Sequence, residues 1–450
     1  MEKRRDFIKK VAIGSAGIAF GGSMAFSAKS YRNIQGANER IHMGIIGVNG
    51  RGNGMGRNFA TQKNAEVAVV CDVDVRAIPK AIKTIMSATP APPNTPRSEK
   101  DCRKVCEDKS IDAIYIATPD HWHSPLTIIG CQGGKHVYCE KPLSHNPREG
   151  ELSVAAARKY NRVVQMGAQR RSAPLLTQGI EELHKGIIGR VYLAKTWYTN
   201  MRKENFLKPG PIPEWLDYEL WQGPAPRKPY QDGLIHYNWH WFWHWGTGEA
   251  LNNGTHEIDV ARWGLGVDYP IRVTSVGGRY HFKDDWETPD TQIITWDYPG
   301  RISMIWESNS CNGRNIEGSD RGIIFYGDNG SLDTGDDGYK VYDLGGKLIK
   351  DVNNKTGAAV AGRDAANPSP GMDSLHIADF LDAIRNNRRP HEDVEDGFKS
   401  TMAAQLGNIC WRLKCDLNID PKNGHIIGNK EAEKLWSREY EKGWDPNDKI

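Results

Sequence analysis

The sequence predicts an α/β protein: an N-terminal domain with a parallel sheet, followed by a C-terminal α/β domain with a large open, mostly antiparallel sheet. Three observations lead to this expectation. Short, continuously apolar runs alternate with helical patterns early in the chain, as in parallel sheets covered on both faces. Later runs alternate apolar and polar residues, which is typical of antiparallel strands. The 450 residues are too many for one ordinary core.

Residues 1–28 carry the features of an export signal. Arg4 and Arg5 precede a phenylalanine and two lysines, and a weakly apolar run rich in Gly, Ala and Ser follows. The run is too short, and its side chains too small, for a stable membrane span. The pattern resembles a Tat-type signal, the address of the route that exports folded proteins. We therefore expect a periplasmic protein with no membrane anchor.

The rest of the chain is electrically neutral. The whole chain has 59 basic and 56 acidic residues, and residues 1–28 hold five and two of them, so 54 of each sign remain. A neutral body argues against nucleic acid as a partner. The eight cysteines show neither a CxxC motif nor a disulfide framework, and we expect no metal site.

The first strand and the turn after it predict a dinucleotide site. Ile41–Ile46 leads directly into Gly47-Val48-Asn49-Gly50-Arg51-Gly52, and a helix with Met55 and Phe59 on its inner face follows. A second strand then ends in Asp72, 20 residues after Gly52. This order is typical of a Rossmann domain, here residues 40–166, in which glycines let the backbone approach the pyrophosphate at the helix N-terminus.

Two residues of this motif carry further expectations. Asp72 would accept hydrogen bonds from the adenosine ribose, which favours NAD over NADP because a 2′-phosphate would meet like charge. Asn49 stands where the pattern has its second glycine, and since Asn tolerates positive φ better than most residues, we expect the turn to survive. The predicted cofactor contacts here are Gly47, Asn49, Gly50, Arg51, Gly52 and Asp72.

Two later strands end in loops at the edge of the sheet where ligands bind. Ile111–Ala117 runs into Thr118-Pro119-Asp120-His121-Trp122-His123, and a further strand runs into Glu140-Lys141-Pro142. We expect Thr118 and Pro119 to contact the cofactor. The Pro- and Thr-rich stretch at residues 87–99 is predicted to be a surface loop.

The combination GIIGVNGRG, CDVD, IATPDHWHSP and GKHVYCEKPLS resembles the Gfo/Idh/MocA oxidoreductases over nearly all of the chain after residue 40. The resemblance implies a Rossmann domain joined to a C-terminal α/β domain, here residues 167–450. It places Lys141 near the nicotinamide and the reacting carbon, with Glu140 and His123 beside the cofactor. It also places Gln169 and Arg170 at the crossing into the second domain, where we expect them to contact cofactor and substrate, respectively.

The second domain is predicted to begin with a helix at residues 174–185, followed by a long strand in GIIGRVYLAKTWYT and a meander of antiparallel strands. Two helices are expected near the C-terminus, at residues 372–385 and 397–414. Because the strands carry many Trp and Tyr, we expect the open face of the sheet to pack against a second subunit. The protein would then be a homo-oligomer, a dimer or a tetramer.

A helix near residue 256 carries the predicted catalytic groups. Asn252, His256 and Asp259 lie at spacings of four and three, on one face, and buried polar groups need partners. The family resemblance implies that His256 takes the proton of the substrate hydroxyl. It also implies an Asp where this chain has Asn252, which can still orient a hydroxyl. Asp259 or Glu257 is a candidate for the missing charge, and Asp259 is also a predicted substrate contact.

The aromatic stretch before this helix predicts sugar contacts. Trp239 and His240 belong to a run that alternates Trp and His, and aromatic faces pack on apolar surface while His bonds to hydroxyls. We expect both residues to contact the substrate, and we expect no metal because no carboxylate pairing accompanies them.

The leading functional hypothesis is an NAD-dependent oxidoreductase acting on a hydroxyl of a sugar or glycoside. An exported enzyme has no pool that recycles its cofactor, so we expect NAD to be tightly bound and reoxidised internally. Two alternatives stay open. One is an NAD-dependent glycoside hydrolase that works by transient oxidation and elimination, and the other is a non-catalytic sugar-sensing relative.

Overall fold

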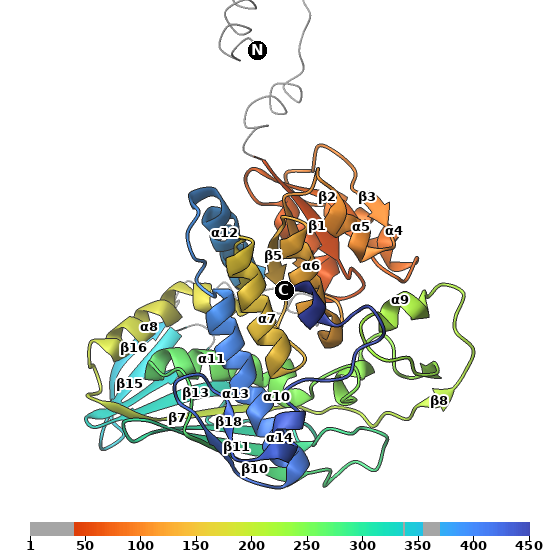
Figure 1. Ribbon diagram of the computed structural model, residues 1–450. Helices are drawn as coiled ribbons and strands as arrows, with labels where there is room; N and C mark the ends of the chain where they lie inside the picture. Colours follow the sequence, from red (N-terminus) through yellow and green to blue (C-terminus); the bar gives the residue numbers. More distant parts are fainter. Residues whose placement is uncertain (1–39, 336–337, 354–369) are drawn as a thin grey trace, which may run out of the picture. The chain divides into compact units, whose positions relative to one another are not determined.

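The computed structural model describes residues 40–335, 338–353 and 370–450, and the predicted export signal lies outside them (Figure 1). Residues 41–450 form one compact unit, so the predicted domain boundary at residue 166 stays a prediction. Two large sheets dominate the unit: a parallel one near its start and a mostly antiparallel one after it. The predicted fold class is confirmed.

The first sheet has six parallel strands in the order β3-β2-β1-β4-β5-β6. The strands are β1 (Ile41–Ile46), β2 (Ala65–Cys71), β3 (Arg97–Glu99), β4 (Ala113–Ile116), β5 (His136–Cys139) and β6 (Val164–Met166). The helices between them are α3 (Arg51–Ala60), α4 (Ala77–Met86), α5 (Cys102–Glu107), α6 (Asp120–Gln132) and α7 (Pro147–Lys159). Met55 and Phe59 are fully buried, as predicted. The predicted surface loop at residues 87–99 contains β3, which pairs with β2 at the sheet edge.

The helix α12 (Pro370–Asn386), far away in sequence, completes one face of this sheet. Its Ile377 and Phe380 belong to the same buried cluster as Phe59, Tyr115 and Tyr138. The C-terminal part of the chain therefore returns to the parallel sheet and packs beside α3.

The second sheet has ten strands in the order β16-β15-β14-β13-β7-β12-β11-β10-β17-β18, and only the β7–β12 pair is parallel. The strands are β7 (Val191–Thr199), β10 (Arg272–Gly278), β11 (Thr291–Tyr298), β12 (Ile302–Asn309), β13 (Arg321–Gly327), β14 (Gly330–Thr334), β15 (Gly338–Asp343), β16 (Leu348–Asn353), β17 (Leu417–Ile419) and β18 (Ile426–Ile427). The predicted meander is thus split in two, because β7 inserts between β12 and β13.

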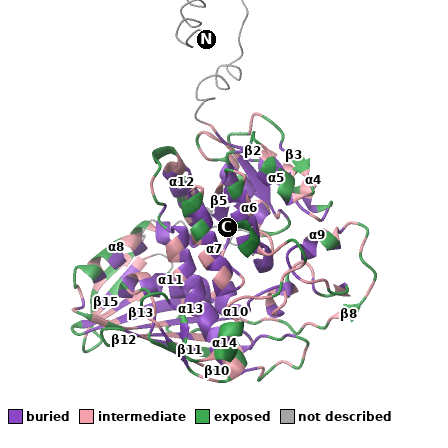
Figure 2. Cartoon of the chain, in the orientation of Figure 1, coloured by how far each residue is buried: buried purple, intermediate pink, exposed green. Residues whose placement is uncertain are grey.

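Helices cover one face of the large sheet (Figure 1). They are α8 (Pro174–His184), α11 (Gly254–Leu265) and α13 (Val394–Leu413), and Figure 2 shows α11 and α13 largely buried. The helix predicted through residues 252–263 is broken at Asn253, where the short α10 (Glu249–Asn252) ends. α11 begins at Gly254, where a Cβ would lie 2.8 Å from the ring of Trp306, so this position has no room for a side chain.

Residues 204–246 form an irregular stretch, here named the aromatic segment. It contains β8 (Lys208–Pro209), α9 (Tyr218–Gln222), β9 (Gln231–Asp232) and the 3-10 turn η2 (Asn238–Trp241). Large aromatic side chains give it a core of its own, in which Trp241 stacks on Trp286 with ring centres 4.3 Å apart. The short helices α14 (Lys430–Lys434) and η3 (Pro446–Lys449) lie in the C-terminal tail.

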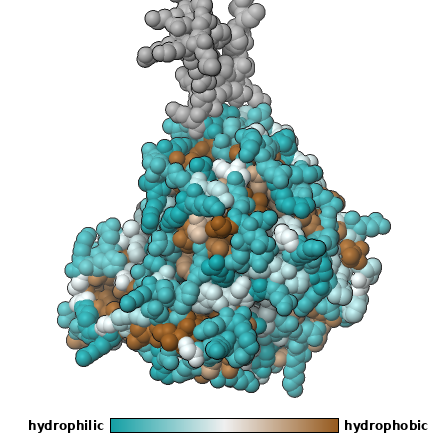
Figure 3. Space-filling model, in the orientation of Figure 1, coloured by the Kyte–Doolittle hydropathy of each residue, from teal (hydrophilic) through white to brown (hydrophobic). Residues whose placement is uncertain are grey.

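The visible surface is mostly hydrophilic, with scattered hydrophobic patches (Figure 3). Among residues 40–335, 338–353 and 370–450, no helix is long and apolar enough to cross a membrane. All eight cysteines are free.

Candidate active site

A cavity of about 630 Å³ opens at the carboxyl edge of the parallel sheet. It runs from the glycine turn after β1 to α10 and α11, and the aromatic segment lines one side of it. Its walls include the predicted residues Gly47, Asn49, Gly50, Arg51, Asp72, Thr118, Pro119, His123, Glu140, Lys141, Gln169, Trp239, His240, Asn252 and His256. One cavity therefore joins most of the predicted cofactor and substrate residues, whereas Gly52, Arg170 and Asp259 are not part of its wall.

The turn after β1 is held by two glycines. Gly47 has φ +82°, and a Cβ on it would lie 2.6 Å from the Ala117 carbonyl oxygen. A Cβ on Gly52 would lie 1.8 Å from the carbonyl oxygen of Gly47. Asn49 is not among the residues with positive φ, so the turn survives because Gly47 makes the bend, and not for the reason predicted.

The region around this turn fits a dinucleotide. The first turn of α3 holds no acidic residue, so its N-terminal N–H groups suit an anionic pyrophosphate. Asp72 directly follows β2 and lines the cavity, where its carboxylate accepts hydrogen bonds from the N–H groups of Val48 at 2.7 Å and Asp74 at 2.9 Å. Burial raises the pKa of Asp72, and these two backbone hydrogen bonds partly offset that effect.

Glu140 ties three elements together beneath the cavity. It accepts hydrogen bonds from Arg51 at 3.0 Å and from the Tyr115 hydroxyl at 2.9 Å. Arg51 also donates to both oxygens of Asp373 on α12, at 2.6 and 2.9 Å. Burial opposes ionisation of Glu140, but the charges of Arg51 and Lys141 keep its pKa below the usual value. Arg51 and Glu140, which are predicted to contact the cofactor, therefore also hold neighbouring elements of the fold together.

His123 is buried between two carbonyl oxygens. Its Nδ1 lies 2.6 Å from the Pro142 carbonyl oxygen and its Nε2 lies 2.9 Å from the Thr118 carbonyl oxygen. Carbonyl oxygens only accept, so a ring with both nitrogens protonated would satisfy both contacts. Burial alone would lower its pKa, yet Cys139, Asp120 and the Pro142 carbonyl raise it to about 9. His123 thus joins the two ligand-binding loops that follow β4 and β5.

Lys141 and Asn252 meet at the other end of the cavity. The Lys141 Nζ donates to Asn252 Oδ1 at 3.2 Å, and the amide nitrogen of Asn252 lies 3.4 Å from Glu249. Glu249 is itself fixed by Arg202 at 3.1 and 3.2 Å. This chain of contacts orients the Asn252 amide with its oxygen toward Lys141. Burial lowers the pKa of Lys141, which suits a proton donor.

His256 lines the same end of the cavity. Burial, together with the charges of Lys141, Arg321 and Arg170, holds its pKa well below the usual value. The ring is therefore neutral, the form that can accept a proton from a substrate hydroxyl. Lys141, Asn252 and His256 are the three predicted catalytic residues, and the structure brings them together.

Two predicted substrate contacts lie elsewhere. Asp259 is fully buried in a two-bond ion pair with Arg171, both bonds 2.8 Å, and Arg170 pairs with Glu257 at 3.2 Å. Neither Asp259 nor Arg170 lines the cavity. The structure corrects the prediction because each side chain is committed to an ion pair that joins α11 to the chain after β6. For the same reason, neither Asp259 nor Glu257 replaces the charge that Asn252 lacks.

The remaining predicted residues lie at the cavity wall. Gln169 donates to the Tyr138 hydroxyl at 3.0 Å. The rings of Trp239 and His240 stack with centres 3.6 Å apart, and the indole N–H of Trp239 donates to the His236 carbonyl. Both rings are therefore held in place at the cavity edge.

Other residues of the cavity wall were not predicted, among them Asp120, Tyr198 and Arg321. Asp120 is 2% exposed, accepts the Thr247 hydroxyl at 2.5 Å and contributes a charge near Lys141. Asp120 directly follows the predicted cofactor contact Pro119, and this position in the sequence could have identified it as a site residue. Tyr198 on β7 and Arg321 on β13 face each other in register, with the guanidinium 4.7 Å from the ring. Only the pairing of these distant strands reveals them.

The chain was compared with protein families. Residues 41–168 match the family described as "Oxidoreductase family, NAD-binding Rossmann fold". Residues 180–412 match "Oxidoreductase family, C-terminal alpha/beta domain". The second match alone covers more than half of the chain.

Curated relatives are similar over part of their length. The chain is 30% identical over 173 residues to inositol 2-dehydrogenase 4 of Saccharopolyspora erythraea, covering 36% of this chain and 47% of that one. It is 28% identical over 153 residues to a glycosyl hydrolase family 109 protein of Shewanella pealeana, covering 31% and 34%. The chain thus spans between a third and a half of these relatives.

Solved structures share the fold over most of the chain. A levoglucosan dehydrogenase in complex with NADH and levoglucosan has a TM-score of 0.64 at 17% identity, covering 84% of this chain and 99% of that one. An aldose-aldose oxidoreductase from Caulobacter crescentus, complexed with glycerol, has a TM-score of 0.62 at 18% identity, with coverages of 84% and 100%.

Proposed function

Because the chain belongs to the Gfo/Idh/MocA family of oxidoreductases, we propose that it is an NAD-dependent enzyme acting on a hydroxyl group of a sugar or glycoside. The observation that carries this proposal is the convergence of Lys141, Asn252 and His256 on one cavity that also reaches the glycine turn. The names of similar proteins, which include sugar and inositol dehydrogenases, support the substrate class.

Three residues of the cavity have different roles at the substrate oxygen. The neutral ring of His256 takes the hydroxyl proton, the Lys141 ammonium holds the oxygen, and Asn252 orients it from the amide that Glu249 fixes. The glycine turn, the start of α3 and Asp72 would hold NAD, which supplies the hydride acceptor when bound. Asp72 supports NAD over NADP because a 2′-phosphate beside it would meet like charge.

Denatured, purified protein provides the first test. Mass spectrometry is expected to find stoichiometric NAD, and incubation of the native protein with a panel of glycosides is expected to convert it to NADH with one of them. Lys141→Ala is expected to retain the nucleotide and to slow this conversion by about 10² or more, the contribution of a positioned acid–base group. Absence of nucleotide, or full turnover in Lys141→Ala, would contradict the proposal. Turnover that is present in the wild type and lost in Lys141→Ala would exclude the sensing role.

A glycoside hydrolase with transient oxidation is the second candidate, favoured by the similarity to glycosyl hydrolase family 109 proteins. The same incubation separates the two candidates. Free sugar released while NAD stays oxidised would favour hydrolysis, whereas NADH that persists until a carbonyl acceptor is added would favour the oxidoreductase.

Export and retention of the cofactor belong to the same proposal. The Tat-type pattern at residues 1–28 supports export of the folded protein to the periplasm with NAD loaded beforehand. Outside the cytoplasm, the cofactor would have to be reoxidised on the enzyme. A fusion of residues 1–40 to a folded reporter is expected to export it, and Arg4→Lys with Arg5→Lys is expected to block export.

The open face of the large sheet supports a homo-oligomer, a dimer or a tetramer. Val276 and Ile293, paired across β10 and β11, are 63% and 39% exposed on that face. Light scattering of the wild-type protein and of Val276→Glu would test this proposal, with a smaller assembly expected for the variant.

A further inference from the structure

The aromatic segment crosses the turn that follows β2. The Val75 N–H donates to the Trp215 carbonyl at 3.1 Å, and the Asp217 N–H donates to the Val73 carbonyl at 3.0 Å. Between them, Asp74 and Leu216 form an antiparallel bridge. The turn directly after Asp72 is therefore joined by its backbone to a segment more than 130 residues later in the chain.

Side chains strengthen this junction. Asp74 is 2% exposed and accepts hydrogen bonds from Arg76 at 2.8 Å and from the His236 ring at 2.9 Å. The Arg76 guanidinium lies 3.4 Å over the Trp215 ring. Arg76 is thus held between a carboxylate of its own turn and an aromatic ring of the crossing segment.

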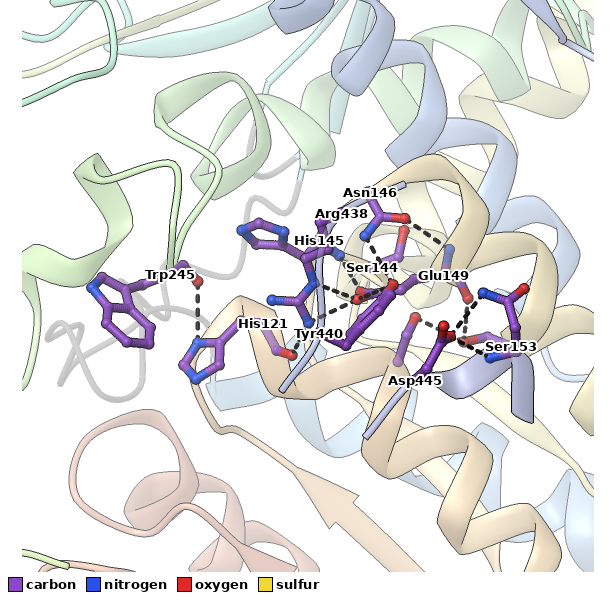
Figure 4. A network of polar contacts seen from close by, with 12 residues as sticks. His121, Ser144, His145, Asn146, Glu149, Ser153, Trp245, Arg438, Tyr440 and Asp445 are labelled. Carbon is purple, nitrogen blue, oxygen red and sulfur yellow. Dashed lines mark hydrogen bonds and ion pairs between the residues drawn. The ribbon is translucent and has the colours of Figure 1, made fainter. Parts of the chain in front are cut away.

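The other end of the segment is also fixed. The His121 ring lies 3.0 Å from the Trp221 carbonyl and 3.3 Å from the Trp245 carbonyl. Arg438 of the C-terminal tail donates to the His121 carbonyl at 2.7 Å and also to the carboxylate of Glu149 (Figure 4). The tail therefore holds the start of α6, on which the far end of the segment rests.

Between these two attachments the segment lines the cavity. Leu220, Trp221, His236 and Tyr237 contribute to its wall from the segment, and Asp72 contributes from the Rossmann side. We propose that the aromatic segment is a strap that retains NAD, and that Asp74, Arg76 and Trp215 form the latch that keeps it in place. This inference rests on the proposed NAD-dependent function. Asp74, Arg76 and Trp215 are positioning residues, since none of them lines the cavity.

The rate of NAD release tests the latch. Purified enzyme would be mixed with excess isotopically labelled NAD, and the exchange of bound nucleotide would be followed by mass spectrometry. Trp215→Ala and Arg76→Gln are each expected to accelerate exchange at least tenfold. The double variant is expected to exchange no faster than the faster single variant, because both changes remove the same contact. Reduction of the bound NAD by substrate in a single turnover is expected to change less than twofold.

Glu219→Gln is the matched control. Glu219 lies on α9 of the same segment, its side chain is 71% exposed, and it pairs with Arg227 rather than with the turn. Its exchange rate is expected to equal that of the wild type. Trp215→Phe keeps a ring beneath Arg76 and is expected to retain slow exchange.

The outcomes separate this inference from the function on which it rests. Wild-type exchange rates in both Trp215→Ala and Arg76→Gln would overturn the strap while leaving the proposed function intact. A wild-type protein that neither contains nor binds NAD would overturn the proposed function. Should Trp215→Ala fail to fold, Arg76→Gln gives the decisive rate, because the Arg76 side chain is 49% exposed and its replacement leaves the core unchanged.

Discussion

The charge on His123 gives the sharpest physical prediction. Its two ring nitrogens face the carbonyl oxygens of Thr118 and Pro142, and its pKa is raised from 6.5 to about 9. That difference corresponds to about 3 kcal/mol in favour of the protonated, folded state. Because the folded pKa lies above the unfolded one, this stabilisation is complete below pH 6.5 and is lost as the pH rises to about 9.

Two measurements test this prediction. Nitrogen NMR of histidine-labelled protein at pH 7.5 should show two protonated nitrogens for His123. His121 is the internal contrast: it also lies between two carbonyls, but burial and Arg438 hold its pKa well below the usual value. In urea unfolding, the stability of the wild type relative to His123→Gln should fall by about 3 kcal/mol between pH 6 and pH 9.5. A neutral His123 at pH 7.5, or a flat stability difference, would refute the reasoning.

Four further predictions follow from the site. Asn252→Asp places a carboxylate about 3.2 Å from the Lys141 ammonium and should raise the pKa of Lys141. The basic limb of the pH profile of kcat/KM should therefore move up by about one pH unit. An unchanged profile would mean that Lys141 takes no part in the reaction. Asp259→Asn should lower the free energy of unfolding by about 3 kcal/mol without changing KM, whereas a raised KM at wild-type stability would place Asp259 against the substrate. Gly52→Ala brings a Cβ against Gly47 and should cost about 3 kcal/mol in urea unfolding; wild-type stability would refute the tight turn. Thiol titration of exported, denatured protein should find all eight cysteines free, and a disulfide would contradict folding before export.

The parts of the site that the sequence revealed are those set by local chain order. A buried strand, a glycine turn and a helix follow one another within residues 41–60, so their geometry depends little on the rest of the chain. Lys141 and His256 were identifiable because each belongs to a short motif that resembles one family. The meeting of Lys141 with Asn252 then follows from the fold that the motifs predict.

The errors come from contacts between residues far apart in sequence. Asp259 shares a helix with His256, but Arg171, 88 residues earlier, binds it away from the cavity. Helical spacing could not reveal this pair. Gly254, next to the break at Asn253, likewise has no room for a side chain because Trp306, far away in sequence, approaches it closely. Arg321 enters the cavity only through its register opposite Tyr198 on a strand that precedes it by more than 100 residues.

The burial of the cysteines bears on the proposed export of a folded protein. Cys71 and Cys102 line the cavity, and burial raises the pKa of both thiols. Burial likewise raises the pKa of Cys106 to about 12, so the reactive thiolate is rare at neutral pH. An unfolded chain would expose the same thiols to an oxidising compartment, where they could cross-link at random. Folding before export would thus protect the thiols. If the proposed strap retains NAD, the same folding step would also place the aromatic segment over the bound cofactor.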